Sequence, residues 1–304
     1  SASQALQIPN QPQKRKGDKM VDILDDNYLA ITALVTIGMQ LLFFAIAFTC
    51  KFDKVTDIAG SMNFLLLVVL TFLARGTYHD RQILVLCLVL VWGSRLGFFL
   101  LRRVLKRGKD ERFDEMREHF FKFLGFWVYQ MFWVWLVSLP FIFLNAAPMV
   151  CSRVINCSLQ DEDFGPRDIV GVILWGVGFI FEVVGDYERN AWNDNPANKG
   201  KLLASGSWSV TRHPNYFGEI SMWIGIFLIS SSVFDKCVRV VPQYSRNDKA
   251  GYVSVLSPAF TYFLLVYVSG VKMSEDRYNQ RYGKDAAYLT YRERVSPLIP
   301  MPQV

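Results

Sequence analysis

The chain has 304 residues, of which 52% are hydrophobic and 15% aromatic, and it carries a formal net charge of +6 at pH 7. This composition is too apolar for an ordinary soluble domain, and long uncharged runs predict an all-α, polytopic membrane protein. Because the basic residues sit at the ends of these runs, as the positive-inside rule describes, we expect membrane lipids and no nucleic acid as partners.

Residues 1–27 are polar and lack apolar periodicity, so we expect a mobile or partner-bound tail. Residues 28–50 contain no charge and are long enough for a first spanning helix, longer than the apolar core of a signal peptide. Residues 58–74 form a shorter apolar run. It is predicted either to span the membrane or to be re-entrant, which would place the N-terminus on the other side.

A third span is predicted at 83–101, with Arg95 inside it. A basic cluster follows and indicates the cytoplasmic or matrix side; it consists of Arg102, Arg103, Lys106, Arg107, Lys109 and Arg112. Four further spans are predicted at 120–144, 169–185, 215–234 and 252–271, the last kinked at Pro258. The total is about seven spans, which places segment 186–214 and the C-terminus on the side of the basic cluster.

The five cysteines form no C-x-x-C pair, so we expect no metal site and no dithiol site. Cys50 and Cys87 are predicted to be small apolar packing residues. If their side of the membrane is oxidising, two of Cys151, Cys157 and Cys237 could form a disulfide.

The segment from Lys199 to Glu219 places polar residues against the start of an apolar helix. Pro214 suits the first helical position, and His213 or Thr211 is predicted to cap the helix. The amides of residues 215–217 would then be unpaired and, with the positive end of the helix dipole, would attract anions. Three cations add formal charge there: Arg212, Lys199 and Lys201. This predicts a site for a phosphate-bearing cofactor, or alternatively contact with lipid headgroups.

Polar residues on two predicted helices could extend this site. Asn215 and Glu219 are four residues apart and share one helix face, with Tyr216 beside them. Glu182, Asp186 and Arg189 form a similar stripe on the preceding span. An ionisable residue inside a membrane span is costly, so we predict that Arg95 pairs with Glu182 or with a cofactor phosphate.

Several segments of the second half resemble the C-terminal domain of the steroid 5-alpha-reductase superfamily, and most closely its branch of poorly characterised integral-membrane proteins. The resemblance is strong over about residues 175–302. It rests on Asn195-Pro-Ala-Asn-Lys-Gly-Lys201, Ser209-Val-Thr-Arg-His-Pro-Asn-Tyr-Phe-Gly-Glu219, Arg281-Tyr-Gly-Lys-Asp285 and Pro297-Leu-Ile-Pro300. The Arg-His-Pro-x-Tyr core is also shared with isoprenylcysteine carboxyl methyltransferases, which use S-adenosylmethionine. Asn215 and Glu219 match the reductases and are usually absent from the methyltransferases.

This resemblance implies NADPH as the cofactor and an apolar small molecule as the substrate. It implies helices on the substrate side over residues 28–145 and a cofactor site within 146–304. The cofactor residues it implies, together with those predicted above, are Asp186, Tyr187, Arg189, Lys199, Lys201, Arg212, His213, Asn215, Glu219, Arg277, Arg281, Tyr282 and Tyr291. The last four have an alternative interpretation as part of an interfacial helix among lipid headgroups.

The first half departs from the steroid reductases, which hold an enone carbonyl with a Glu in the second span and a Tyr near the third. Here the second span has no Glu, and Trp92-Gly-Ser94 precedes Arg95. We therefore expect another group, such as Tyr129, to polarise the substrate, with Glu219 and Tyr216 as the other candidate catalytic residues.

Three hypotheses follow. The favoured one is an NADPH-dependent reductase of a C=C bond in a steroid-like or other enone, in the endoplasmic reticulum or alternatively the mitochondrial inner membrane. The second is methyl transfer from S-adenosylmethionine to a prenylcysteine or a lipid. The third is a non-catalytic subunit of a larger membrane complex, which the missing Glu and Tyr and the charged tail favour.

Overall fold

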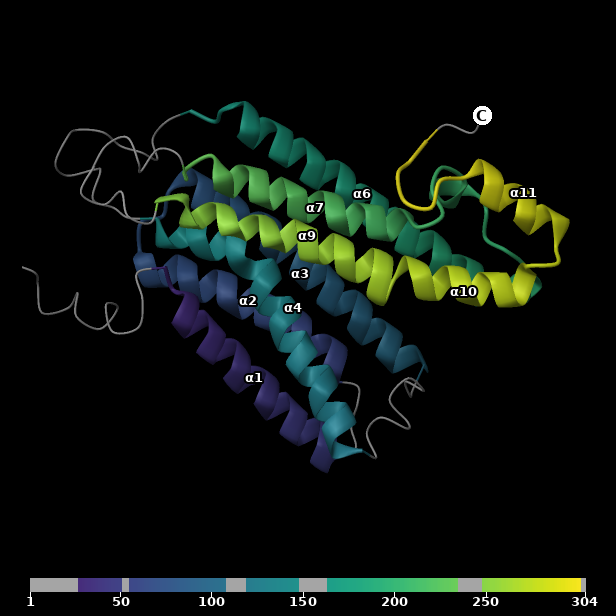
Figure 1. Ribbon diagram of the computed structural model, residues 1–304, viewed down its shortest axis with the longest axis horizontal. Coiled ribbons are helices and arrows are strands. Elements are labelled where there is room, and N and C mark those ends of the chain that lie inside the picture. The colour runs from purple at the N-terminus through teal and green to yellow at the C-terminus, as the bar shows by residue number, and fades with distance from the viewer. Residues whose placement is uncertain (1–26, 51–54, 108–118, 148–162, 235–247, 302–304) are drawn as a thin grey trace, which may run out of the picture.

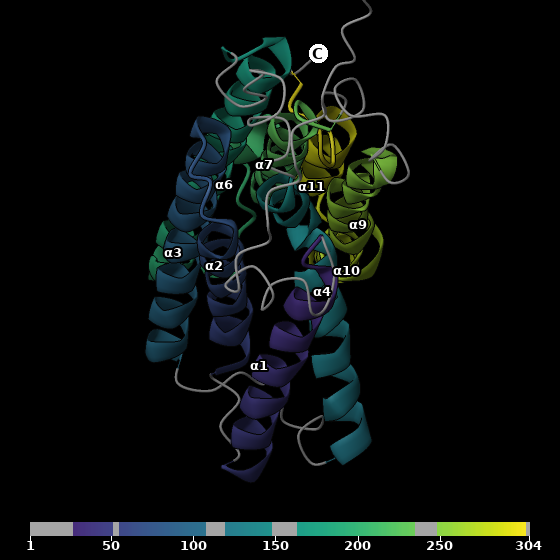
Figure 2. The same ribbon diagram turned by 90° about the vertical axis from the view of Figure 1, so that its left-hand side faces the viewer.

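A computed structural model describes residues 27–50, 55–107, 119–147, 163–234 and 248–301, and in these ranges the chain is helical with no strand. Figure 1 shows elongated helices bundled side by side, with α10 and α11 projecting at one end. Figure 2 gives the same bundle from its end. Residues 1–26 of the predicted tail, the three cysteines of the predicted disulfide, and Lys109 and Arg112 of the basic cluster lie outside the described residues.

The first half contributes four long helices: α1 (Leu29–Thr49), α2 (Val55–Arg75), α3 (Asp80–Arg107) and α4 (Phe120–Ala146). The second half contributes α6 (Pro166–Asp194), η4 (Pro196–Asn198), η5 (Gly206–Ser209), α7 (Pro214–Ser231), η7 (Asp248–Val255), α9 (Leu256–Phe263), the π-helical η8 (Leu264–Val268), α10 (Val271–Tyr282) and α11 (Ala286–Arg294). The all-α prediction is confirmed for these residues.

Within the described part of the chain, five helical stretches are long and apolar enough to cross a membrane, so the predicted count of seven is wrong by this criterion. They are Leu29–Thr49, Asp80–Arg102, Phe120–Ala146, Pro166–Asp194 and Ala250–Tyr282. In the second predicted span the apolar helix, Ile58–Ala74, is too short to qualify. The sixth predicted span, α7, includes Asn215, Glu219 and three serines, and it buries much of its length among its neighbours. A helix enclosed by protein need not be uniformly apolar.

Helix α1 buries polar side chains and exposes apolar ones, as expected where lipid is the solvent. Thr32, Thr36 and Gln40 recur every four residues and are at most 1% exposed. The Gln40 amide donates to Asn63 Oδ1 on α2 at 3.0 Å. Leu42, in contrast, is 60% exposed.

Glycines allow the backbones of α6 and α7 to touch. Gly171 and Gly178 lie seven residues apart on α6, and they face Gly225 and Gly218 on α7. A Cβ atom at Gly178 would lie 2.6 Å from the carbonyl oxygen of Gly218, and one at Gly171 would lie 2.8 Å from that of Gly225. Only hydrogen fits at these positions, so the two helices form the closest contact of the described bundle.

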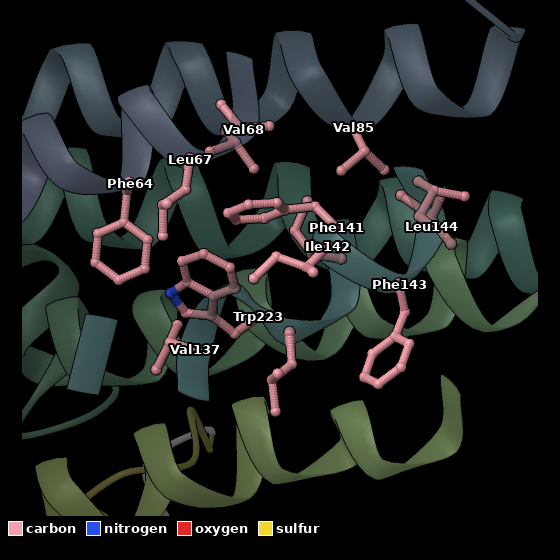
Figure 3. Packing of buried hydrophobic residues seen from close by; sticks show 14 of the residues in the cluster. Phe64, Leu67, Val68, Val85, Val137, Phe141, Ile142, Phe143, Leu144 and Trp223 are labelled. Atoms are coloured by element: carbon pink, nitrogen blue, oxygen red, sulfur yellow. The ribbon is translucent and has the colours of Figure 1, made fainter. Parts of the chain in front are cut away.

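Large apolar side chains fill the space between this helix pair and the first four helices. Figure 3 shows Phe64 of α2, Phe141 and Ile142 of α4, and Trp223 of α7 in the shared core. The Phe64 and Trp223 rings are 5.6 Å apart, and Trp92 of α3 lies 5.0 Å from Trp223. Aromatic packing of this kind links the two halves of the chain.

A buried ion pair joins α3 to α6 at the end where both helices begin. Arg81 donates to both oxygens of Asp168, at 3.1 and 3.0 Å, and both residues are at most 2% exposed. Asp168 also accepts from the Gly165 amide and from the Ser232 hydroxyl. Both carboxylate oxygens of Asp168 therefore accept hydrogen bonds, as a buried ion pair requires.

Two smaller predictions are wrong. Cys50 and Cys87 are exposed instead of packed inside. Pro258 lies in the first turn of α9, where its missing N–H disrupts nothing, and the irregular segment is η8, six residues later.

The glycine contact gives a stability prediction. Gly178→Ala places a methyl group against α7, and we expect a loss of about 1–3 kcal/mol, as in other overpacked interiors. Gly176→Ala, on the same helix with nothing within 4 Å of the added Cβ, is the matched control and should keep or slightly raise stability. Thermal unfolding in mild detergent measures both; equal unfolding temperatures would contradict the close contact.

Candidate functional site

Helix α7 begins at Pro214, as predicted, but no side chain caps it. The Thr211 hydroxyl accepts from the His213 amide at 3.4 Å and donates to Leu298 O, so the predicted cap by His213 or Thr211 is wrong. The Phe217 amide is also already bonded, to His213 O. Among the described residues, the amides of Asn215 and Tyr216 remain without an acceptor, so the anion-attracting helix start is smaller than predicted.

The C-terminal segment is tied to the residues before α7. Arg212 N donates to Ser296 O at 2.9 Å, and Met301 N donates to Val210 O at 3.1 Å. In Figure 1 this segment and α11 lie at the end of the bundle where α7 starts. Segments eighty residues apart in sequence therefore form one side of the site.

His213 and Arg212 share Glu275 of α10. His213 is fully buried, and its Nε2 lies 3.0 Å from Glu275 Oε1, while its ring stacks on Tyr216 at 5.2 Å. Arg212 Nη1 lies 3.4 Å from Glu275 Oε2 and donates to Arg292 O. Arg212 Nε and His213 Nδ1 are buried without a partner among the described residues. The predicted cation Arg212 therefore contacts Glu275 and Arg292 O inside the protein, and its Nε–H has no partner among the described residues.

Arg95 of α3 pairs with α6, which confirms one of the two predicted pairings. Its two terminal nitrogens donate to Glu182 Oε1 and Asp186 Oδ2, both at 2.5 Å. Asn215 Nδ2 donates to Asp186 Oδ1 at 3.3 Å, which links α7 to the pair. Glu182 Oε2 and Asn215 Oδ1 are buried and lack a partner among the described residues.

Glu219 lies one turn deeper on α7, held by two indoles. Trp92 Nε1 donates to its Oε2 and Trp223 Nε1 to its Oε1, both at 2.9 Å. The same indoles line an apolar gap together with Val89, Trp175, Met222 and Ile226, and this gap has no room for a water molecule. An apolar substrate could therefore reach Glu219 only if one of the indoles moved.

A second group of the predicted cofactor residues lies around Trp208. Trp208 Nε1 donates to Gly185 O, Arg189 lies over its ring at 5.3 Å, and Tyr291 donates to its carbonyl oxygen at 2.7 Å. Burial raises the pKa of Tyr291, so its hydroxyl stays a donor. Glu188 accepts from both the amide and the hydroxyl of Ser207.

The remaining predicted residues are on the surface. Lys199 and Lys201 are exposed, and Tyr282 donates to Lys201 O. Arg281 lies over the Tyr282 ring. Tyr187 is 73% exposed, and Arg277 donates to Met273 O of its own helix. Tyr129 packs against Phe260 of α9, and no contact in the described part of the chain joins it to Glu219.

The structure brings together residues that sequence reasoning did not select. Trp92, Trp223 and Glu275 hold three of the central polar groups. Trp223 lies four residues after Glu219, a spacing that puts both on one helix face and could have indicated the contact. The pairing of Glu275 with His213 spans 62 residues and leaves no local signal.

A family model described as "Protein of unknown function (DUF1295)" matches residues 43–295, which is most of the chain and includes every candidate cofactor and catalytic residue predicted from the sequence. The chain belongs to the DUF1295 family. One relative is a probable O-methyltransferase, ustE, of Ustilaginoidea virens, 44% identical over 68 residues. That match covers 22% of this chain and 24% of the relative, so the two share about a quarter of their lengths. No solved structure matches this DUF1295 protein.

His213 gives a pH prediction. Burial lowers the pKa of His213 from its ordinary 6.5, although Glu275 acts in the opposite direction. The unfolded chain therefore takes up this proton at a higher pH than the folded protein, so stability present above about pH 6.5 is lost as the pH falls below it. We expect the unfolding temperature of the wild type to fall more between about pH 7 and pH 5 than that of His213→Gln, which keeps an N–H for Glu275. His119→Gln, at an exposed histidine, is the control; equal slopes for wild type and His213→Gln would refute the prediction.

Proposed function

We propose that the protein is a membrane NADPH-dependent reductase that acts on a C=C bond of a lipid-soluble substrate. The observation that carries the proposal is the placement of Asn215 and Glu219, one turn apart on α7, at a helix start that has two free amides and is preceded by the buried Arg212. The resemblance to steroid 5-alpha-reductases implies the same cofactor. The membrane would be that of the endoplasmic reticulum or, alternatively, the inner mitochondrial membrane.

The residues present fit such a cofactor. Arg212 Nε is a buried donor without a partner among the described residues, suited to a phosphate oxygen, and Arg212 precedes the free amide of Asn215 by three residues. Asn215 Oδ1 and Glu182 Oε2 are buried acceptors without a partner, suited to the N–H groups of a carboxamide. The donors and the Asn215 acceptor thus lie at the start of α7, and Glu182 lies one turn deeper, beside Gly218.

When bound, NADPH would supply a hydride. The chain itself would hold the phosphates with Arg212 and with the exposed Lys199, Lys201 and Arg189, and would close over them with the C-terminal helices. The residues of the C-terminal helices that would contact the cofactor are Arg277, Arg281, Tyr282 and Tyr291. Asp186 and Tyr187 would border the same cleft, while His213 would hold Tyr216 by stacking.

The carboxylates would favour hydride loss electrostatically. A nicotinamide ring gains a positive charge when it gives up hydride, and Glu219, with Glu182 and Asp186 nearby, provides negative charge in a water-poor interior. Trp92 and Trp223 would exclude water and fix the Glu219 carboxylate. Because the gap beside them is too narrow for a substrate, binding would require an indole to rotate. Tyr129 packs against Phe260 and has no contact with this cluster in the described part of the chain, whereas Tyr216 lies on α7 itself, so Tyr216 is the better placed of the two tyrosines.

A second candidate is methyl transfer from S-adenosylmethionine, which the name of the ustE relative favours. The same negative charge would stabilise the sulfonium of that cofactor. Asn215 and Glu219 argue for the reductase, since the related methyltransferases usually lack both.

Ligand identity tests the proposal. In mild detergent, NADPH at 100 times its dissociation constant should stabilise the protein by about 2.7 kcal/mol, while NADH and S-adenosylmethionine at the same concentration do less. Glu219→Gln should abolish NADPH stabilisation and turnover while the unfolding temperature without ligand stays near wild type; Glu293→Gln, at an exposed site, is the control.

A preference for S-adenosylmethionine would replace the reaction class. No response to any of the three ligands would contradict the enzyme proposal and favour a structural subunit, which stoichiometric copurification with other membrane subunits would support.

A further inference from the structure

The interior of the bundle holds more negative than positive charge. Glu182 and Asp186 of α6 and Glu219 of α7 surround the single guanidinium of Arg95. All three carboxylates and Arg95 interact electrostatically. With every group ionised, the cluster would carry two uncompensated negative charges in a membrane-embedded interior, which is costly.

The hydrogen bonds show which of the three carboxylates has an oxygen without a donor. Asp186 accepts from Arg95 and Asn215, and Glu219 accepts from two indoles, so both carboxylates have donors on both oxygens. Glu182 bonds Arg95 through Oε1 only, and its Oε2 is buried without a donor. The Glu182 side chain is 6% exposed. An ionised oxygen in that position would lack any compensation, whereas a protonated one could donate to a neighbouring carboxylate.

Glu219 is that neighbour. Gly178 and Gly218 bring α6 and α7 together at this level, and a Cβ at Gly218 would lie 2.7 Å from the Glu182 amide nitrogen. Both carboxylates also reach the same stretch of α3, because Glu182 accepts from Arg95 and Glu219 accepts from Trp92, three residues earlier on that helix. Two carboxylates in one buried site take up a proton jointly, because the second ionisation is opposed by the first.

We propose that Glu182 and Glu219 together hold one exchangeable proton, so that the cluster is a buried proton-binding site. A metal cation fits less well, because the Arg95 guanidinium already occupies the cluster. Within the described ranges no group of three His, Cys, Asp or Glu residues is arranged to hold a metal ion.

The charged groups around the pair come from three helices: Arg95 from α3, Asp186 and Arg189 from α6, and none beyond Glu219 itself from the described part of α7. Arg95 is 17% and Asp186 12% exposed, against 6% for Glu182. Exposure thus increases toward the end of α6, which gives the proton a polar route to the aqueous side where the cofactor residues lie.

A consequence for catalysis rests on the proposed function. Reduction of a C=C bond adds hydride to one carbon, and the electron pair of the double bond moves to the other carbon, which then needs a proton. The Glu182–Glu219 pair would supply that proton, be left as two carboxylates and recover a proton from water. NADPH would be the reductant, so the balance needs no other reactant.

A carbodiimide tests the proton site in the resting full-length protein. Dicyclohexylcarbodiimide enters apolar regions and reacts with protonated carboxylic acids, and peptide mass spectrometry locates the adduct. We expect an adduct at Glu182 or Glu219 at neutral pH and its loss at alkaline pH. Asp168 is an internal control on the helix of Glu182, because it is buried but forms an ion pair with Arg81 and accepts hydrogen bonds at both oxygens; it should remain unlabelled.

Substitutions test whether Glu182 and Glu219 share one proton. Glu182→Gln removes the repulsion on Glu219, which should then ionise and lose its label; Glu219→Gln should likewise abolish labelling of Glu182. An infrared carbonyl band of a neutral carboxylic acid should be present in the wild type at neutral pH and absent from both variants. This readout keeps the test valid if the reagent cannot reach the pair.

Full labelling of one residue after substitution of the other would overturn the sharing. Absence of the infrared band from the wild type would overturn the proton site, and protection of the label by Na⁺ but not by choline would replace the proton with a metal cation. These measurements use no NADPH, so the proton site and the reductase proposal can fail separately.

Discussion

The close approach of α6 to α7 determines where the buried carboxylates Glu182 and Glu219 lie. Gly171 and Gly178 on α6 contact Gly225 and Gly218 on α7 through their backbones. A larger side chain at any of these four positions would collide with the facing helix. Glu182 is four residues after Gly178 and Glu219 is next to Gly218, so the contact that packs the helices also brings two carboxylates together. These buried carboxylates are stabilised by two donors on α3: Arg95 donates to Glu182, and Trp92 donates to Glu219. The glycine contact and the charged cluster are therefore one structural unit.

The same unit separates two environments along α7. At its start, Arg212 and His213 are held by Glu275 and by the C-terminal segment, and Arg212 Nε and His213 Nδ1 are buried without a partner among the described residues. One turn deeper, Glu219 is enclosed by indoles that belong to the apolar core in Figure 3. A ligand that used both regions would need a charged end and a flat, uncharged end. The boundary between them is the Asn215 side chain, which is bonded on one side only.

Local signals predicted much of this arrangement. The uncharged runs located α1, α3, α4 and α6, and Pro214 located the start of α7, because lipid and proline each restrict the chain through nearest neighbours. The pairing of Arg95 with Glu182 could be predicted because an intramembrane charge needs a partner. The span count failed where burial in protein replaced exposure to lipid, as in α7. The capping of α7 and the pairing of His213 with Glu275 depend on which distant segments pack together, and helical periodicity does not encode that choice.

The two ion pairs between α3 and α6 are separated by the same number of residues on both helices. Arg81 and Arg95 are 14 residues apart, as are their partners Asp168 and Glu182, so the helices run parallel with both contacts about 21 Å apart along their axes. During synthesis α3 is made first, and its two arginines enter the membrane before either carboxylate exists. Until α6 follows, α3 is poorly suited to lipid on its own and must be held by water, headgroups or the insertion machinery. The arrival of α6 satisfies both charges at once, so insertion of the second half of the chain completes that of the first.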